Sequence, residues 1–110
     1  MKKVEAIIRP EKLEQVKRAL EKRGFFPMTV TEVRGRGAQK GICLQFRGKK
    51  IEVDLIPKVR IDMVVPDSDV TPIIEIIRAE GRTGKNGDGK IFITHVEMVA
   101  AVRTDEIIMV

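Results

Sequence analysis

The chain has no tryptophan or tyrosine, one cysteine and one histidine in 110 residues. Its aromatic residues are Phe25, Phe26, Phe46 and Phe92. Because proteins that bind single-stranded nucleic acid stack bases on aromatic side chains, this scarcity argues against such a surface. A lone Cys43 cannot form an internal disulfide, so we expect a reducing, cytoplasmic environment.

Long apolar runs are also missing. No stretch approaches the length needed to cross a membrane. The apolar run after Lys2 and Lys3 ends at Arg9, which is too short for a secretory signal. The length predicts one domain over residues 1–110. A net charge of +5 favours an acidic partner, which leaves nucleic acid, a membrane surface and a phosphorylated small molecule open.

Two similar halves make up the chain. Residues 1–9 and 58–65 read as strands, and Pro10 and Pro66 mark the starts of helices that Gly24 and Gly81 end. Asp67, Ser68 and Asp69 offer capping oxygens for the second helix. Further strands are predicted at 28–33 and from 90 to about 103. The order βαββαβ predicts an α+β, ferredoxin-like fold.

That fold leaves one face of its sheet uncovered. Ile91, Phe92 and Ile93 place apolar groups on both faces of the predicted last strand, so we expect the uncovered face to meet other subunits.

A basic, glycine-rich segment from residue 34 to about 54 separates the second and third strands. Loops of about 20 residues are uncommon in compact domains and are usually functional or disordered. We interpret this one as a flexible functional arm, in which 42–46 and 51–56 could form a hairpin.

The most informative motif is Thr83-Gly84-Lys85-Asn86-Gly87-Asp88-Gly89-Lys90, within a predicted anion-binding loop over 82–90. Its glycines expose backbone N–H groups and its lysines add positive charge. Gly84, Gly89 and Lys90 match the P-loop spacing, but Ile91 stands where that motif needs a hydroxyl for magnesium. The residues after it read as a strand, so any phosphate is bound differently. On composition alone, a glycine-rich hairpin remains an alternative.

No catalytic set is evident. His95, Glu97 and Asp62 lack matching acid, base or nucleophile partners in the sequence, so we do not expect an enzyme. An ATP-hydrolysing enzyme is disfavoured by the missing P-loop hydroxyl.

The motif Thr83-x-x-x-Gly87-Asp88-Gly89-Lys90-Ile91-Phe92 resembles the PII family of nitrogen-signalling proteins. The resemblance covers residues 1–103 without an apparent gap. Further matching segments are Met28-Thr29-Val30, Gly35-x-Gly37-x-Gln39-Lys40-Gly41 and Pro57-Lys58-Val59. These segments favour the family over a simple hairpin. The resemblance implies a homotrimer that binds ATP or ADP between subunits, with 2-oxoglutarate beside the nucleotide.

Site residues follow from the same resemblance. Gly87, Asp88, Gly89 and Lys90 would wrap the phosphates, with Gly35 and Gly37 nearby. Thr29 and the backbone of Val64 would meet the adenine, and Arg103 would reach across from a neighbour. Gln39 would hold Mg²⁺, since an amide oxygen suits a hard cation. The effector 2-oxoglutarate would contact Gln39, Lys40, Gly41 and Lys58.

Departures from the family pattern bear on regulation. Ala38 and Ala101 stand where arginines are common, which removes two phosphate contacts and bears on nucleotide affinity and on ATP against ADP. Ile51 replaces a tyrosine and Lys49 a serine that other members have modified. Control through those modifications is therefore excluded by composition.

The implied output is docking of the arm over residues 36–54 on a target, most simply an ammonium transporter of the Amt type. Arg47 stands where family members insert an arginine into the transporter's pore mouth, so contact with a membrane would come only through that partner. Glutamine synthetase or another enzyme of nitrogen metabolism is an alternative target. A ferredoxin-like RNA-binding module is a rival of another class, disfavoured because residues 1–9 and 58–65 contain no aromatic residue.

Overall fold

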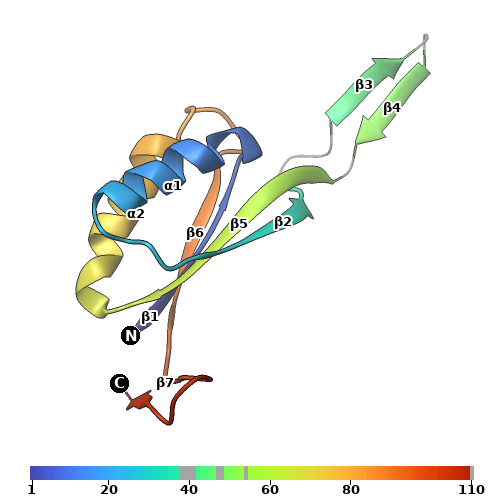
Figure 1. Ribbon diagram of the computed structural model, residues 1–110. Coiled ribbons are helices and arrows are strands. Elements are labelled where there is room, and N and C mark those ends of the chain that lie inside the picture. Colours follow the sequence, from blue (N-terminus) through green and yellow to red (C-terminus); the bar gives the residue numbers. More distant parts are fainter. Residues whose placement is uncertain (38–41, 47–48, 54, 110) are drawn as a thin grey trace.

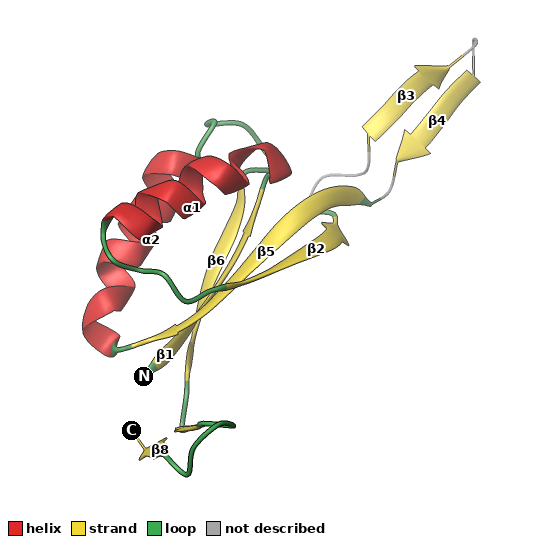
Figure 2. Ribbon diagram, in the orientation of Figure 1, coloured by secondary structure: helices red, strands yellow, loops and turns green. Residues whose placement is uncertain are grey.

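The computed structural model describes residues 1–37, 42–46, 49–53 and 55–109, with side chains for 1–37 and 55–108. Its centre is a four-stranded antiparallel sheet in the order β2-β5-β1-β6. The strands are Thr29–Gly35, Ile56–Val65, Lys2–Ile8 and Gly89–His95. Two helices cover one face of this sheet (Figure 2). The βαββαβ order confirms the predicted ferredoxin-like α+β fold.

Each helix begins with a 3₁₀ turn. Turn η1, Pro10–Lys12, leads into α1, Leu13–Lys22, and turn η2, Asp67–Asp69, leads into α2, Val70–Gly81. The predicted capping by Asp67, Ser68 and Asp69 is wrong, because no side chain caps either η2 or α2. The turn bonds its own backbone instead, from Asp69 N to Pro66 O, and the Asp67 carboxylate pairs with the N-terminal ammonium at 3.2 Å.

Helix α1 ends as the sequence predicts. Gly24 has a φ of +85°, and the N–H groups of Gly24 and Phe25 donate to the carbonyls of Glu21 and Leu20. This pair of bonds is the Schellman arrangement, which satisfies carbonyls at a helix end and favours glycine at the left-handed position.

The core forms where alternate strand residues meet the helices. Its buried members come from β1, β5, α1 and α2: Val4, Ala6, Ile8, Val59, Ile61, Met63, Val65, Val16, Leu20, Ile73 and Ile77. Because side chains alternate along a strand, the residues between them lie on the opposite face, which no helix covers. We call this the open face. It carries Ile7, Thr29, Lys58, Arg60, Asp62, Val64, Lys90 and Phe92.

The last strand is shorter than predicted. Strand β6 ends at His95, which pairs with Lys2, and beyond Val96 no residue of β1 is left to pair with. The chain pairs with itself instead, as the hairpin of β7, Met98–Ala100, and β8, Ile107–Met109. The predicted continuous strand from 90 to 103 is therefore wrong, and Arg103 lies in the turn of a separate hairpin.

A second hairpin lies between β2 and β5. Strand β3, Ile42–Phe46, pairs with β4, Lys49–Val53. The predicted hairpin is confirmed, with its first strand at 42–46. Its second strand covers 49–53 instead of 51–56, because Ile56 already belongs to β5. Figure 1 shows this hairpin extending past the ends of β2 and β5, away from the helices. In the described part of the chain, no helix is both long and apolar enough to span a membrane.

Candidate functional site

The loop between α2 and β6 rests on the end of β1. Gly84, Gly87 and Gly89 all have positive φ, of +84°, +96° and +103°. At Gly89 a side chain is also excluded by space, because a Cβ there would lie 1.7 Å from the carbonyl oxygen of Ile7. The loop can therefore follow this path only with glycine at position 89.

Asp88 binds the inside of this loop. Its Oδ2 accepts hydrogen bonds from the backbone N–H groups of Thr83 at 2.8 Å and Gly84 at 2.9 Å. Its Oδ1 accepts from the Thr83 hydroxyl and from Nε of Arg9 at 2.9 Å. The Thr83 hydroxyl, with further help from the Arg9 guanidinium, holds the pKa of the Asp88 carboxyl well below its usual range. Asp88 is thus a carboxylate that organises its own loop.

Two cations, Arg9 just after β1 and Lys58 on β5, donate hydrogen bonds to carbonyl groups of the same loop. Nη2 of Arg9 donates to the carbonyl oxygen of Asn86 at 2.7 Å. Nζ of Lys58, on the open face of β5, donates to the carbonyl oxygen of Gly87. The loop is therefore attached to the ends of β1 and β5 as well as to β6.

Other groups of the loop remain available. Among the described residues, the backbone N–H groups of Asn86, Gly87 and Asp88 have no protein acceptor. Consecutive free N–H groups beside lysine side chains are a common way to bind an anion. Lys90 follows on the open face, opposite Ile7 of β1. This geometry can hold a phosphate.

Thr29, Lys58, Val64 and Lys90 share the open face. Thr29 pairs with Asp62, and Lys90 pairs with Ile7. Asp62 and Ile7 each lie between two buried residues of their strands, so they face away from the helices. Strands β2 and β6 are three spacings apart, about 14 Å. A nucleotide that touched both Thr29 and Lys90 of one chain would have to lie across the whole sheet.

The other predicted site residues that the structure describes, Gly35, Gly37 and Arg103, lie away from the loop. Gly35 ends β2 and Gly37 follows it, both near the start of the arm. Gln39, Lys40, Gly41 and Arg47 lie outside the described residues, as does Ala38. Lys90 lies at the start of β6, whereas Arg103 lies in hairpin β7–β8, past the other end of that strand. Figure 1 shows the position of this hairpin. One chain alone therefore does not bring Arg103 to the loop.

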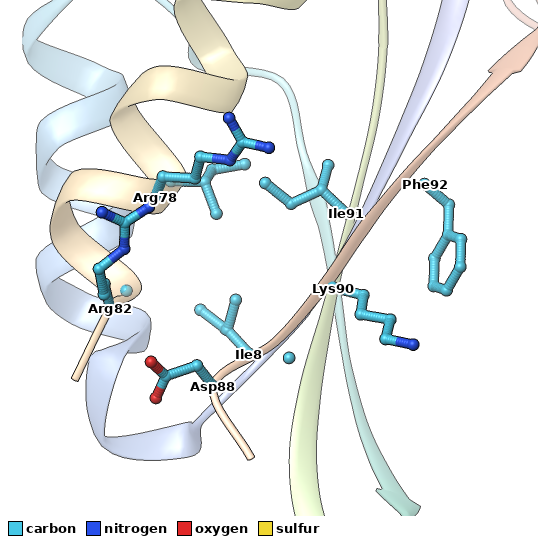
Figure 3. A pocket seen from close by; sticks show the side chains of 10 residues that line it. Ile8, Arg78, Arg82, Asp88, Lys90, Ile91 and Phe92 are labelled. Carbon is cyan, nitrogen blue, oxygen red and sulfur yellow. The ribbon is translucent and has the colours of Figure 1, made fainter. Parts of the chain in front are cut away.

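A groove of about 410 Å³ lies on the other side of β6. Its apolar wall includes Ile8, Ile77 and Ile91, and Arg78 and Arg82 lie along its helix side. Figure 3 shows Lys90 and Phe92 pointing away from this groove, on the opposite side of the strand. This groove therefore lies on the helix face, where Asp88 and Gly89 also border it, whereas the side chain of Lys90 is on the open face.

Sequence reasoning missed Arg9 as a site residue. It stood out only as the residue before Pro10, in the repeated strand–proline pattern, and its partner Asp88 is 79 positions away. No local signal links the two. As for metals, the described residues contain no cluster of three histidine, cysteine or carboxylate side chains that could hold an ion.

Comparison with known proteins gives a consistent result. The family model described as nitrogen regulatory protein P-II matches residues 1–106. The chain is 55% identical to "Nitrogen regulatory protein P-II 2" of Methanothermobacter thermautotrophicus, over 96% of this chain and 92% of that protein. It is 51% identical to a nitrogen regulatory protein P-II of Microchaete diplosiphon and 48% identical to one of Rhizobium meliloti, each over 96% of this chain and 95% of the relative. The chain belongs to the nitrogen regulatory protein P-II family.

Proposed function

We propose that this nitrogen-regulatory protein senses ATP or ADP at loop 82–90 and 2-oxoglutarate beside it, and passes the signal on by docking rather than by catalysis. The observation that supports this most directly is the loop itself. Three consecutive free N–H groups, at Asn86, Gly87 and Asp88, adjoin Lys90 on a face that also carries Lys58. These groups suit a chain of phosphates.

Calorimetry with ATP and with ADP tests this proposal. Lys90→Ala should weaken binding about tenfold or more, because a hydrogen bond to a charged group contributes about 1.5–3 kcal/mol. Lys22→Ala, which removes the same charge at the exposed end of α1, is the control and should leave the affinity unchanged. A parent protein that bound neither nucleotide would overturn the sensor. A normal affinity in Lys90→Ala would remove that residue from the site.

The proposed effector site adds Mg²⁺ and 2-oxoglutarate. Gln39 would offer an amide oxygen to the ion, Lys40 and Gly41 would contact the effector, and Lys58 would pair with a carboxylate. Lys58 already donates to the carbonyl of Gly87, so the effector would exchange that bond for an ion pair. We expect 2-oxoglutarate to bind only when Mg-ATP is present, since one ion would bridge both ligands. Calorimetry on protein freed of nucleotide and metal checks this, and Gln39→Ala should abolish the effector's binding.

Homotrimeric assembly is part of the proposal. Val64 and Phe92 are 45% and 46% exposed on the open face of one chain, and a second copy could bury them. Assembly would also give Arg103 of one chain a route to the loop of another. Light scattering at micromolar concentration should return three times the chain mass, and a monomer mass would contradict this.

The proposed target is an Amt-type ammonium transporter, reached from the cytoplasm through the arm over residues 36–54. Arg47 would enter the pore mouth with a long cation that donates several hydrogen bonds. Ligands bound near Gln39 would select among shapes of the arm by differential contacts. Pull-down of a co-expressed transporter should differ between ADP and Mg-ATP with 2-oxoglutarate, and Arg47→Ala should lose retention. Equal retention in both ligand states would reject the transporter as target.

A further inference from the structure

We propose that the ion pair between Arg9 and Asp88 is the positioning element of the nucleotide loop, and that the Asp88 carboxylate acts on the loop's own backbone and not on the ligand. This inference rests on the proposed function for the identity of the ligand. It assigns to Asp88 a role different from the phosphate contact expected from the family resemblance, and it adds Arg9, which no sequence motif indicated.

The hydrogen bonds of Asp88 leave its carboxylate little capacity to contact a ligand. Both carboxylate oxygens are occupied, Oδ2 by the N–H groups of Thr83 and Gly84, and Oδ1 by the Thr83 hydroxyl and Nε of Arg9. A carboxylate with four donors has little capacity left for Mg²⁺. It would also repel a phosphate placed in direct contact with it.

Arg9 joins the end of β1 to the loop. Arg9 follows the last residue of β1, and Ile8 of that strand is in register with Gly89. One guanidinium group donates to the side chain of Asp88 and to the carbonyl of Asn86, so it connects both ends of the segment 86–88. The Arg9 side chain is only 24% exposed, as is that of Asp88, which restricts the pair to one geometry.

The Asp88 contacts also determine which N–H groups of the loop remain free. Asp88 consumes the N–H groups of Thr83 and Gly84, and the Thr83 hydroxyl accepts from Lys85 N at 3.2 Å. The free N–H groups are then the three consecutive ones at 86, 87 and 88. The ion pair therefore decides which part of the loop is presented to an anion. A loop ordered before binding avoids the entropy cost of ordering on binding.

The test compares Arg9→Gln with Arg18→Gln, the same substitution on the exposed face of α1. Amide hydrogen exchange of Thr83 and Gly84 is measured without ligand, and ATP affinity by calorimetry. Arg9→Gln should raise the exchange rates of both amides about tenfold or more and weaken ATP binding about tenfold. The midpoint of denaturant unfolding of the variant and the parent is measured separately, to distinguish a local change in the loop from a loss of overall stability. Arg18→Gln should change neither quantity. Arg9→Lys should recover only part of the effect, since an ammonium cannot reproduce the two-sided guanidinium contact.

The outcomes are distinguishable. Unchanged exchange at Thr83 and Gly84 in Arg9→Gln would overturn the positioning role, whether or not ATP binds. Raised exchange with unchanged ATP affinity would also overturn it, because the loop would then bind without the ion pair. If Arg9→Gln fails to fold, Asp88→Asn gives the same two measurements from the other partner. A parent that binds no nucleotide refutes the proposed function, while the exchange comparison still reports on the loop.

Discussion

Loop 83–88 precedes β6 and hairpin β7–β8 follows it, and different interactions hold the two segments. The loop is attached to Arg9, just after β1, through the ion pair with Asp88 and to Lys58 of β5 through the carbonyl of Gly87. Three further hydrogen bonds, from Thr83 and Gly84 to Asp88, hold the loop internally. The hairpin is held by its own short ladder and by one backbone bond across its turn, from Ala101 N to Glu106 O. Among side chains described for residues 98–108, none forms an ion pair.

The loop and the hairpin also differ in the kind of side chain that they expose. Loop 83–88 contains only polar residues and glycine, which tolerate water. The hairpin exposes apolar side chains: Met98 is 48%, Ile107 59% and Val102 104% exposed. The polar loop is therefore held by contacts within one chain, whereas the hairpin leaves apolar side chains exposed that the proposed assembly would cover.

The largest effect is expected at Gly89. Gly89→Ala places a Cβ where the carbonyl of Ile7 lies and also requires a φ of +103°. We expect the free energy of unfolding to fall by about 3–5 kcal/mol, because a backbone atom has to move as well as a dihedral. Denaturant unfolding measures this. Gly84→Ala is the control, since its φ of +84° is similar but nothing lies within 4 Å of its Cβ, and it should lose only about 1–2 kcal/mol. Equal losses would mean that the contact with β1 does not matter.

A smaller effect is expected at the hairpin, and on assembly rather than folding. Val102→Asp places a charge on the most exposed apolar residue. If a second copy buries Val102, the substitution removes about 1.5–3 kcal/mol per chain of the free energy gained by burying this side chain in the trimer. The cost of burying a charge adds to that loss. Light scattering over a dilution series should show dissociation at higher concentration than for the parent. Thr71→Asp, an added charge on exposed α2, should leave the mass unchanged. Identical dilution curves for Val102→Asp and the parent would place Val102 outside any interface.

Acid should weaken the loop through protonation of Asp88. The pKa of Asp88 is lowered in the folded chain, chiefly by the Thr83 hydroxyl and then by Arg9, so its contribution to stability is complete above the unfolded pKa of about 4. That contribution is lost as the pH falls toward the folded pKa. Urea unfolding at pH 7 and pH 3, at fixed protein concentration, should show a smaller loss on acidification in Asp88→Asn than in the parent. The pKa of Asp67 is also lowered, by its bond to the N-terminal ammonium. The same measurement on Asp67→Asn therefore separates the contribution of this second carboxylate from that of Asp88.

The same contrast explains what sequence could and could not predict. Alternation in residues 58–65 and helical spacing of Val16 and Leu20 reflect burial against one sheet, which is a local pattern with a single solution. The fold and its core were therefore predictable. The glycines of the loop were recognisable too, since positive φ is a local requirement.

Long-range choices were less accessible. The end of β6 depends on where β1 begins, because Lys2 is the last partner that β1 offers, opposite His95. The apolar run continues through Val96 and Met98 and gives no sign of that limit. The partnership of Arg9 with Asp88 joins residues 79 positions apart and depends on the register of Ile8 with Gly89. Periodicity carries no information about such a pair.

The smallest effect is expected at Lys85, which separates the charge of the loop from its geometry. The described contacts of Lys85 are limited to its backbone N–H, which donates to the Thr83 hydroxyl, so its side chain plays no part in holding the loop. Lys85→Ala should leave exchange of the Thr83 and Gly84 amides at the parent rate. Its effect on ATP affinity should be a few fold at low salt and should fade by about 0.5 M salt, because an exposed charge acts through a screened field. Calorimetry at two salt concentrations measures this, with Lys90→Ala as the comparison whose loss persists in salt. A salt-resistant loss in Lys85→Ala would show that this side chain contacts the phosphate directly. The loop would then depend on both of its lysines for binding and on Asp88 for its shape.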